Sequence, residues 1–350
     1  MSSECTFPWT GMVINPQGNI TVCCAYADRK SLGHIDDIDD LNDFFLDDSY
    51  TNLRQKFENG YKNNPSCIHC VKYTKGPIMH SQSFNRNGGG LQYLELTTSN
   101  VCNQTCATCS SKFSSKWSNI NEIFGRTDYS KAYSMSNENI DTIIRVLPNL
   151  KEVQIKGGEP FADMKNLKII TALAKVNPEC MLRICSNFQM IPKAFMVAMK
   201  KMKSLKVAAS VDGIDARYDW IRGGNFKKVV ENIEWFYQET GSLASINPCV
   251  SIYNIDHLRE IWEYFKDKDF AKLYSIYNIV EQPEIHAPQS MLSQEEIDNT
   301  ITRQFDDIRN EIDVDALYNI KSNLKSSLIP EFVKFTETMN KVRGFKIETR

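Results

Sequence analysis

Three cysteines in one short loop constrain this chain more than any other feature. Cys102, Cys106 and Cys109 fall within eight residues, in the stretch Cys-Asn-Gln-Thr-Cys-Ala-Thr-Cys. Three thiolates at this spacing can hold three irons of a four-iron cluster and leave the fourth iron open to a small molecule. A structural zinc site is the alternative, but zinc normally takes four protein ligands, and the nearby sequence has no fourth cysteine or histidine. The loop therefore favours an iron-sulfur cluster with one open iron.

A glycine-rich turn strengthens this interpretation. Gly157-Gly158-Glu159-Pro160 follows directly after a predicted strand at 152–156. The two glycines expose backbone at the carboxyl end of a strand, where barrels bind ligands, and the glutamate can accept hydrogen bonds from an ammonium group. The turn lies one strand-helix unit after the cysteine loop, so the two motifs together carry more weight than either alone.

The chain as a whole has the composition of an ordinary globular protein, with 42% hydrophobic and 24% charged residues. A formal net charge of -2 gives no general attraction to nucleic acid or anionic lipid. No signal-like start and no membrane-length apolar run is present, so the sequence predicts a cytoplasmic protein with neither nucleic acid nor membrane as a partner. In a reducing compartment, eleven cysteines indicate metal ligation or burial instead of disulfides.

Strand and helix patterns alternate from residue 92 onward, which predicts a parallel sheet closed or partly closed into a barrel. The sequence divides into a small domain at 1–88, a barrel at 89–285 and a helical extension at 286–350, with Gly88-Gly89-Gly90 as the first joint. The predicted strands lie at 92–97, 152–156, 181–185, 206–211, 248–253 and 273–279. The predicted helices lie at 137–147, 164–175, 193–202, 226–239 and 256–266.

The cysteine loop and the Gly157–Pro160 turn resemble the signature of the radical S-adenosylmethionine (SAM) superfamily. That family has a CxxxCxxC loop after its first barrel strand and a GGEP turn after its second. The resemblance implies an α/β fold with a partial (β/α)6 barrel. It also implies that Cys102, Cys106 and Cys109 ligate a [4Fe-4S] cluster whose open iron chelates the amino and carboxylate groups of SAM.

Further stretches match the family at the ends of later strands. Ser186-Asn187 stands where the family often has Thr-Asn, Ser210 ends the next strand, and Arg222 opens an Arg-Gly-x-x-Phe stretch. In related enzymes the serine and arginine contact the SAM carboxylate. Thr108 departs from the pattern, because the family usually has an aromatic residue there that packs near adenine. The expected SAM-binding residues are Gly157, Gly158, Glu159, Pro160, Ser186, Asn187, Ser210 and Arg222.

The amino-terminal cysteines resemble the first half of the SPASM motif, called a twitch domain when it holds one cluster. Cys5 is followed by Gly18 after twelve residues, then by Cys23 after four more, and later by Cys67-Ile68-His69-Cys70. Neighbouring residues of an extended segment point to opposite sides, so only one of Cys23 and Cys24 should ligate, and the glycine spacing favours Cys23. A zinc ribbon remains the alternative. The implied ligands of an auxiliary [4Fe-4S] cluster are Cys5, Cys23, Cys67 and Cys70.

Further matches to twitch-domain radical SAM proteins of bacteria and phages run along nearly the whole chain. They include Pro8-Trp9, Ser114 through Trp117 and, near the end, Arg343-Gly344. That group has no single shared substrate. The resemblance therefore specifies the chemistry better than the purpose.

Side-chain alternation along the strands gives three candidate catalytic residues: Glu95, Lys156 and Asp212. They fall on the side opposite the apolar residues that should meet the outer helices, so they should line a polar interior. An equally good interpretation is that Glu95 and Lys156 only pair with each other. The scattered Cys180, Cys185 and Cys249 lie in or beside apolar strands and should be buried.

The resemblance implies an enzyme that cleaves SAM reductively and takes a hydrogen atom from a substrate through a 5'-deoxyadenosyl radical. The favoured substrate is a peptide or protein side chain, and a flavodoxin- or ferredoxin-type protein would supply the electron. One alternative is the same chemistry on a nucleoside, a sugar or another small metabolite. The other is a zinc-binding or electron-transfer module without SAM chemistry.

Overall fold

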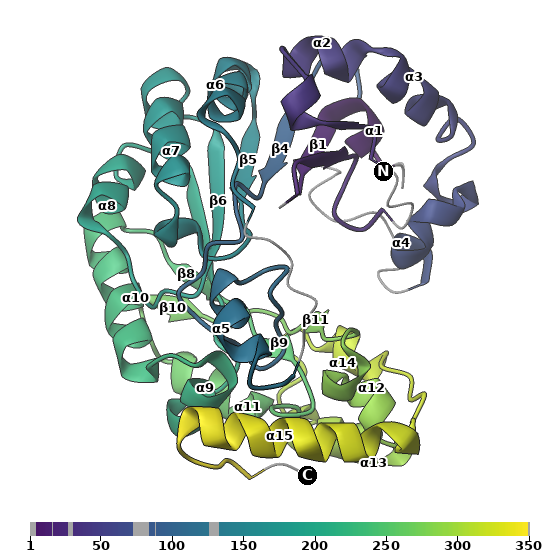
Figure 1. Ribbon diagram of the computed structural model, residues 1–350, viewed down its shortest axis with the longest axis vertical. Coiled ribbons are helices and arrows are strands. Elements are labelled where there is room, and N and C mark those ends of the chain that lie inside the picture. Colours follow the sequence, from purple (N-terminus) through teal and green to yellow (C-terminus); the bar gives the residue numbers. More distant parts are fainter. Residues whose placement is uncertain are drawn as a thin grey trace. The chain divides into compact units, whose positions relative to one another are not determined.

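The computed structural model describes residues 5–15, 17–26, 31–72, 84–87, 89–125 and 133–348. These residues form two compact units, each built from segments that are far apart in the sequence, as the colours of Figure 1 show. The first unit takes in the described parts of residues 1–101, 132–184 and 192–205. The second takes in the described parts of 102–131, 185–191 and 206–350.

The first unit is built on a sheet with the strand order β3-β2-β1-β4-β5-β6. Strand β4 is parallel to both β1 and β5, and β5 is parallel to β6, whereas β1, β2 and β3 pair antiparallel. The strands are β1 (Gly11–Ile14), β2 (Asn19–Thr21), β3 (Gly33–His34), β4 (Tyr93–Leu96), β5 (Glu152–Ile155) and β6 (Met181–Ser186).

Strand β1 places the amino-terminal segment beside the first predicted barrel strand. All four of its residues are buried, and Met12 lies opposite Leu94 and Ile14 opposite Leu96 in the parallel register. The amino-terminal strands therefore extend the same sheet that β4 and β5 build. The domain division at residue 88 stays a prediction, and Gly88 itself lies outside the described residues.

Helices α6, α7 and α8 pack side by side along the sheet of the first unit (Figure 1). Among the amino-terminal helices, α2 and α3 are capped by Asp40 and Asp47, whose carboxylates accept hydrogen bonds from backbone N–H groups of the first turn. The helices of this unit are α1 (Phe7–Thr10), α2 (Leu41–Leu46), α3 (Asp48–Gln55), α4 (Ile68–Lys72), α6 (Asn137–Val146), α7 (Met164–Val176) and α8 (Lys193–Met199).

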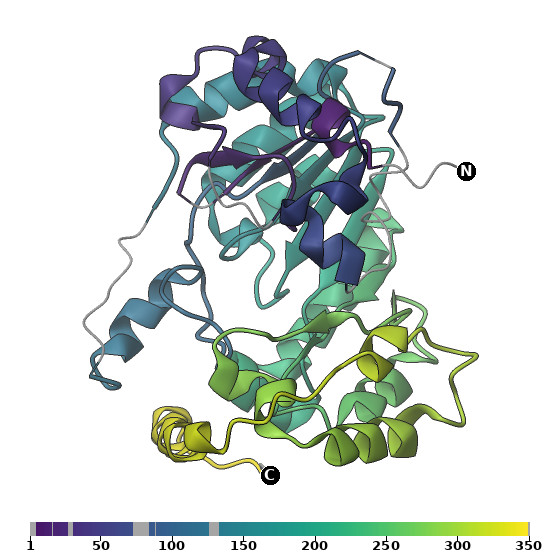
Figure 2. The same cartoon turned by 90° about the vertical axis from the view of Figure 1, so that its right-hand side faces the viewer.

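In the second unit, β7 (Leu205–Ala209), β8 (Ala244–Ile246) and β10 (Ala271–Lys272) are parallel neighbours. A separate parallel pair joins β9 (Cys249–Val250) to β11 (Asn278–Ile279). Figure 2 shows α13 and α15 in this unit, in yellow-green and yellow. Its helices are α5 (Ser118–Asn121), α9 (Asp215–Arg222), α10 (Phe226–Thr240), α11 (Leu258–Phe265), α12 (Pro288–Met291), α13 (Gln294–Phe305), α14 (Asp315–Tyr318) and α15 (Ile329–Arg343).

The α/β class, with parallel strands followed by helices and a helical carboxyl-terminal segment, is confirmed. Two strand predictions are wrong in extent. The stretch 273–279 contributes only β11, and 248–253 contributes only β9, because the side chain of Asn254 accepts from the Ser251 N–H at 2.7 Å and bends the chain. Among the described helices, none is both long and apolar enough to cross a bilayer.

Candidate functional site

The loop with Cys102, Cys106 and Cys109 lies in the second unit and is held from several sides. The Cys106 carbonyl accepts hydrogen bonds from the Cys109 N–H and from the Trp117 indole, both at 3.0 Å. The Cys102 N–H donates to the Ser115 hydroxyl at 3.3 Å. The short 3₁₀ helix Ser115–Trp117 thus fixes the backbone on which the three thiols stand.

The three thiols lie close enough to influence one another. Burial raises the pKa of Cys109, and the neighbouring Cys106 and Cys102 raise it further. Burial also raises the pKa of Cys106, although the guanidinium groups of Arg222 and Arg343 lower it. A bound metal deprotonates the thiols that ligate it, so three neighbouring thiols fit an iron-sulfur cluster despite these raised pKa values.

The Gly157–Pro160 turn belongs to the first unit. It packs tightly against residues 99–101, which follow strand β4. A Cβ on Gly158 would lie 2.1 Å from the Val101 carbonyl oxygen, and Gly157 has a φ of +130°. The Glu159 N–H donates to the same Val101 carbonyl at 2.8 Å. Only glycine permits so close an approach of two backbones. Val101 directly precedes the cluster cysteine Cys102 in the sequence.

Glu159 itself is 2% exposed, and its carboxylate accepts a hydrogen bond from the Phe161 N–H at 3.1 Å. It therefore caps the 3₁₀ helix Pro160–Ala162. Close by, Asp163 accepts hydrogen bonds from the hydroxyls of Thr98 and Ser99 at 2.8 and 2.7 Å. These contacts give the turn a structural role, and its predicted role toward the SAM ammonium group stays a prediction.

Arg222 forms a buried ion pair with Asp212 at 2.9 Å, and the two side chains are 13% and 1% exposed. The other Asp212 oxygen accepts from the Cys249 N–H at 2.7 Å. Arg222 Nε is buried and has no hydrogen-bond partner among the described residues. A buried donor of this kind suits an anionic ligand group, since buried donors are normally paired.

Among the other predicted SAM-binding residues of the second unit, Asn187 contacts the cluster loop directly. Asn187 Nδ2 donates to Asn103 Oδ1 in that loop at 2.7 Å, and the Ser186 hydroxyl accepts from the Phe188 N–H at 2.9 Å. The Ser210 hydroxyl lies 3.6 Å from Cys185 Sγ. The structure therefore brings these residues together with the three thiols within one compact unit.

The sequence interpretation missed residues near the cluster loop. Cys180 is buried as predicted, but Cys185 and Cys249 are half-buried. Burial raises the pKa of Cys249 to about 12, and the nearby groups Asp212, Cys106 and Cys185 contribute to this rise. A pocket of about 280 Å³ is lined by Thr108, Cys109 and Phe113, and Phe113 is 46% exposed. No local motif marked Phe113 as part of this pocket.

The catalytic candidates have partners of their own. Glu95 and Lys156 form an ion pair at 2.5 Å, and the Tyr93 hydroxyl lies 3.0 Å from the other Glu95 oxygen. Asp212 uses both oxygens, as described above. The paired interpretation of Glu95 and Lys156 thus agrees with the structure, and a catalytic role for any of the three stays a prediction.

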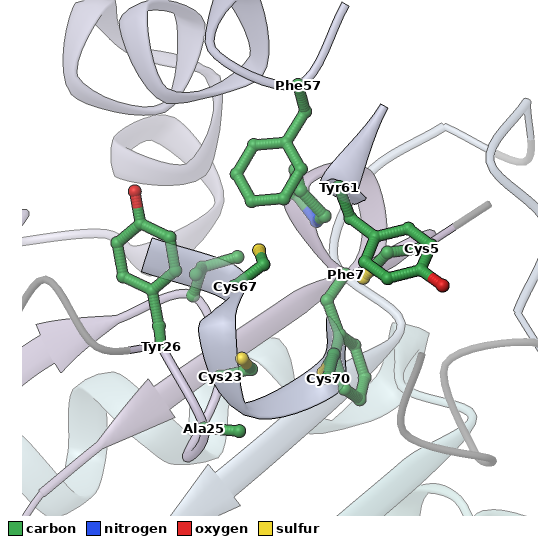
Figure 3. Close-up of a pocket in the computed structure, with 11 residues that line it drawn as sticks. Cys5, Phe7, Cys23, Ala25, Tyr26, Phe57, Tyr61, Cys67 and Cys70 are labelled. Carbon is green, nitrogen blue, oxygen red and sulfur yellow. The ribbon is translucent and has the colours of Figure 1, made fainter. Parts of the chain in front are cut away.

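A second thiol site lies in the first unit. Figure 3 shows four cysteines around a pocket whose remaining walls are apolar or aromatic. Burial raises the pKa of Cys23 and of Cys67, and neighbouring thiols in the group add to both shifts. Four thiols in dry surroundings fit a complete iron-sulfur site. The cysteines that line the pocket are Cys5, Cys23, Cys67 and Cys70.

Cys24 does not line this pocket. Although Cys24 is exposed, the protein atoms around its thiol and the charge of Glu95 raise its pKa to about 11, while Lys156 lowers it. The thiol thus lies near the Glu95–Lys156 pair, whereas Cys23 lies with the other cysteines. The two side chains separate at a turn after strand β2, where the Tyr26 N–H donates to the Cys23 carbonyl at 3.4 Å. This separation agrees with the choice of Cys23 as the ligand.

Comparison with known proteins gives two family matches. The profile of the Radical SAM superfamily matches residues 96–265, and that of the SPASM iron-sulfur cluster-binding domain matches residues 5–71. No curated protein sequence matches the chain.

Several solved structures are similar. Native anSMEcpe with bound AdoMet has 18% sequence identity, 64% coverage of each chain and a TM-score of 0.48. Streptococcus suis SuiB has 15% identity, 78% coverage of this chain and 54% of its own, and a TM-score of 0.45. A radical SAM methyltransferase from Sphaerobacter thermophilus has 13% identity, coverages of 53% and 58%, and a TM-score of 0.37. The chain thus spans less than two thirds of the length of these proteins.

The two matched segments contain the two thiol sites. The SPASM match includes Cys5, Cys23, Cys67 and Cys70, and the Radical SAM match includes the loop Cys102–Cys109 and the Gly157–Pro160 turn. The first match implies an auxiliary iron-sulfur cluster, and the second implies a [4Fe-4S] cluster with SAM. Residues 96–265 thus form a radical SAM domain, and residues 5–71 form an amino-terminal SPASM-type cluster-binding domain.

Proposed function

We propose that this protein is a radical SAM enzyme that modifies a peptide or protein side chain. When bound, the cluster and SAM supply a 5'-deoxyadenosyl radical, which takes a hydrogen atom from the substrate. The observation that carries the proposal is the grouping of the three-thiol loop with Arg222, whose buried Nε has no partner among the described residues. We further propose the domain boundaries 1–88, 89–285 and 286–350, supported by the two profile matches.

Each residue then has a defined task. Cys102, Cys106 and Cys109 hold the cluster through three of its irons. Arg222, oriented by Asp212, binds the SAM carboxylate through its Nε, which has no partner in the part of the chain that the structure describes, and Ser210 assists from the end of the neighbouring strand. The buried surroundings keep water away from the reacting atoms.

The substrate class rests on the amino-terminal domain. SPASM and twitch domains are typical of radical SAM enzymes that act on peptides, and the match covers residues 5–71. The second cluster would bind the substrate or accept the electron left after hydrogen abstraction. A flavodoxin- or ferredoxin-type protein would deliver the first electron. This analogy is at the level of the domain, so the substrate needs a direct test.

Hydrogen transfer identifies the substrate class without knowledge of the substrate. An extract of cells grown in D₂O is separated by size into a peptide and protein fraction and a small-metabolite fraction. The anaerobic holoenzyme is then given SAM, dithionite and one fraction, and 5'-deoxyadenosine is analysed by mass spectrometry. We expect deuterium in 5'-deoxyadenosine only with the peptide fraction. Deuterium from the metabolite fraction alone would support the nucleoside or sugar alternative.

Substitution of Arg222 separates SAM binding from cluster binding. Arg222→Ala should keep both clusters and weaken SAM binding roughly tenfold or more, because a charge-assisted contact to the carboxylate is lost. Arg222→Lys is the matched variant, since it can keep a cation beside Asp212 but lacks Nε. Calorimetric titration with SAM measures both. Wild-type affinity in both variants, with iron content unchanged, would remove Arg222 from the site.

A further inference from the structure

The last helix of the chain ends against the cluster loop. Arg343, the final residue of α15, donates from Nη1 to the Thr105 hydroxyl at 2.8 Å and from Nη2 to the Thr105 carbonyl at 2.5 Å. Its Nε donates to the Trp220 carbonyl at 2.8 Å. Thr105 stands between Cys102 and Cys106 in the sequence, so one guanidinium group joins the cluster loop to helix α9.

The guanidinium group also lies over the start of the Arg-Gly-x-x-Phe stretch. Gly223 has a φ of +64°, and a Cβ there would lie 2.7 Å from Arg343 Nη1. Gly223 follows Arg222, which forms the ion pair with Asp212. Arg343 therefore packs against the residue next to the proposed SAM-binding arginine as well as against the cluster loop.

Helix α15 is anchored so that Arg343 is held in place. Asn340 accepts a hydrogen bond from the Trp220 indole at 2.8 Å. Earlier in the same helix, the ring of Phe335 stacks on that of Trp117, with centroids 6.4 Å apart. The Trp117 indole in turn donates to the Cys106 carbonyl. The helix thus contacts the cluster loop directly through Arg343 and indirectly through Trp117.

The charge of Arg343 acts at the cluster as well. Burial lowers the pKa of the guanidinium to about 10, so it stays protonated at neutral pH and places a cation against Thr105, between Cys102 and Cys106 in the loop. A cation near an iron-sulfur cluster stabilises the reduced, more negative state and raises the reduction potential. Gly344, with a φ of +78°, ends the helix directly after this residue.

We infer that Arg343 is a positioning residue for the SAM-binding cluster, an inference that rests on the proposed function. It fixes the loop between Cys102 and Cys106, ties this loop to the segment that carries Arg222, and favours reduction of the cluster. The Arg343-Gly344 pair has no role in the proposed reaction itself, and these contacts give it a physical explanation.

The test compares variants of the full-length, reconstituted protein under anaerobic conditions. Arg343→Met removes all three hydrogen bonds and the charge but keeps the length of the side chain, and Arg343→Lys keeps the charge. Lys341→Ala, an exposed position on the same helix, is the control. The measurements are the rate of iron release to a chelator, the midpoint potential of the SAM-binding cluster, and its electron paramagnetic resonance spectrum with and without SAM.

We expect Arg343→Met to release the iron of this cluster roughly tenfold faster, because charge-assisted hydrogen bonds that hold its loop are lost. Its midpoint potential should fall and its spectral response to SAM should weaken. Arg343→Lys should keep a midpoint potential near that of the wild type but still release iron faster. Lys341→Ala should behave as the wild type. A wild-type release rate and potential in Arg343→Met would overturn the inference.

Thr105→Val covers the case in which Arg343→Met does not fold. It removes only the hydroxyl acceptor and leaves the charge in place, so iron release should be faster while the potential stays near that of the wild type. If Arg343→Met fails to fold and Thr105→Val releases iron at the wild-type rate, the inference is also overturned. Failure of the proposed function appears separately, as unchanged iron in a protein that lacks Cys102, Cys106 and Cys109.

Discussion

Replacement of Cys102, Cys106 or Cys109 by alanine is expected to abolish dithionite-dependent formation of 5'-deoxyadenosine. Each thiol would ligate one iron, and only the fourth iron should be open to SAM, so losing any one thiol leaves an incomplete cluster. Hydrogen bonds to Ser115 and Trp117 hold the loop backbone, so the two remaining thiols of the loop stay at their own positions. We expect a loss of activity to the background level.

The measurement is the yield of 5'-deoxyadenosine per chain after anaerobic reconstitution, alongside the iron content. Cys180→Ala is the matched control, because Cys180 is buried, belongs to the first unit and does not line the four-thiol pocket. It should cleave SAM like the wild type. If all three loop variants fold and still form 5'-deoxyadenosine, the central proposal is wrong.

Replacement of Cys67 by alanine is expected to separate SAM cleavage from turnover of the substrate. The four-thiol pocket needs no ligand from the Cys102–Cys109 loop, so the variant should lose about four of about eight irons per chain. Uncoupled cleavage of SAM should continue, because its cluster is intact. Modification of the true substrate should fall to background, since the second cluster would bind substrate or accept the leftover electron.

Metal analysis of Cys67→Ala, paired with the 5'-deoxyadenosine assay, checks this result. Cys24→Ala is the matched control, because Cys24 does not line the pocket and should be replaceable without loss of iron. Iron loss in Cys24→Ala would instead make Cys24 a ligand. Unchanged iron and lost zinc in Cys67→Ala, with local unfolding, would establish the zinc ribbon and leave a single-cluster enzyme.

The sequence alone determined the parts of this protein whose chemistry is local. The spacing of Cys102, Cys106 and Cys109 and the Gly157–Pro160 turn pointed to the family that the profile comparison shows. Alternating strand and helix patterns predicted the α/β class, because the periods of the two elements are visible within a few residues. Strand ends were less certain, since side-chain contacts such as that of Asn254 bend the chain where apolar residues continue.

Only the tertiary structure decided which distant segments meet. No pattern near residue 11 shows that β1 lies parallel to β4, and none near residue 109 shows that Gln282 and Pro283 line a pocket with Cys109. The ion pair of Arg222 with Asp212 and the contacts of Arg343 with Thr105 join residues that are 10 and 238 positions apart. Spacing encodes contacts within one turn or loop, whereas these contacts depend on how whole elements pack. The sequence thus specified the ligands of the proposed clusters, and packing determined the residues that hold them in place.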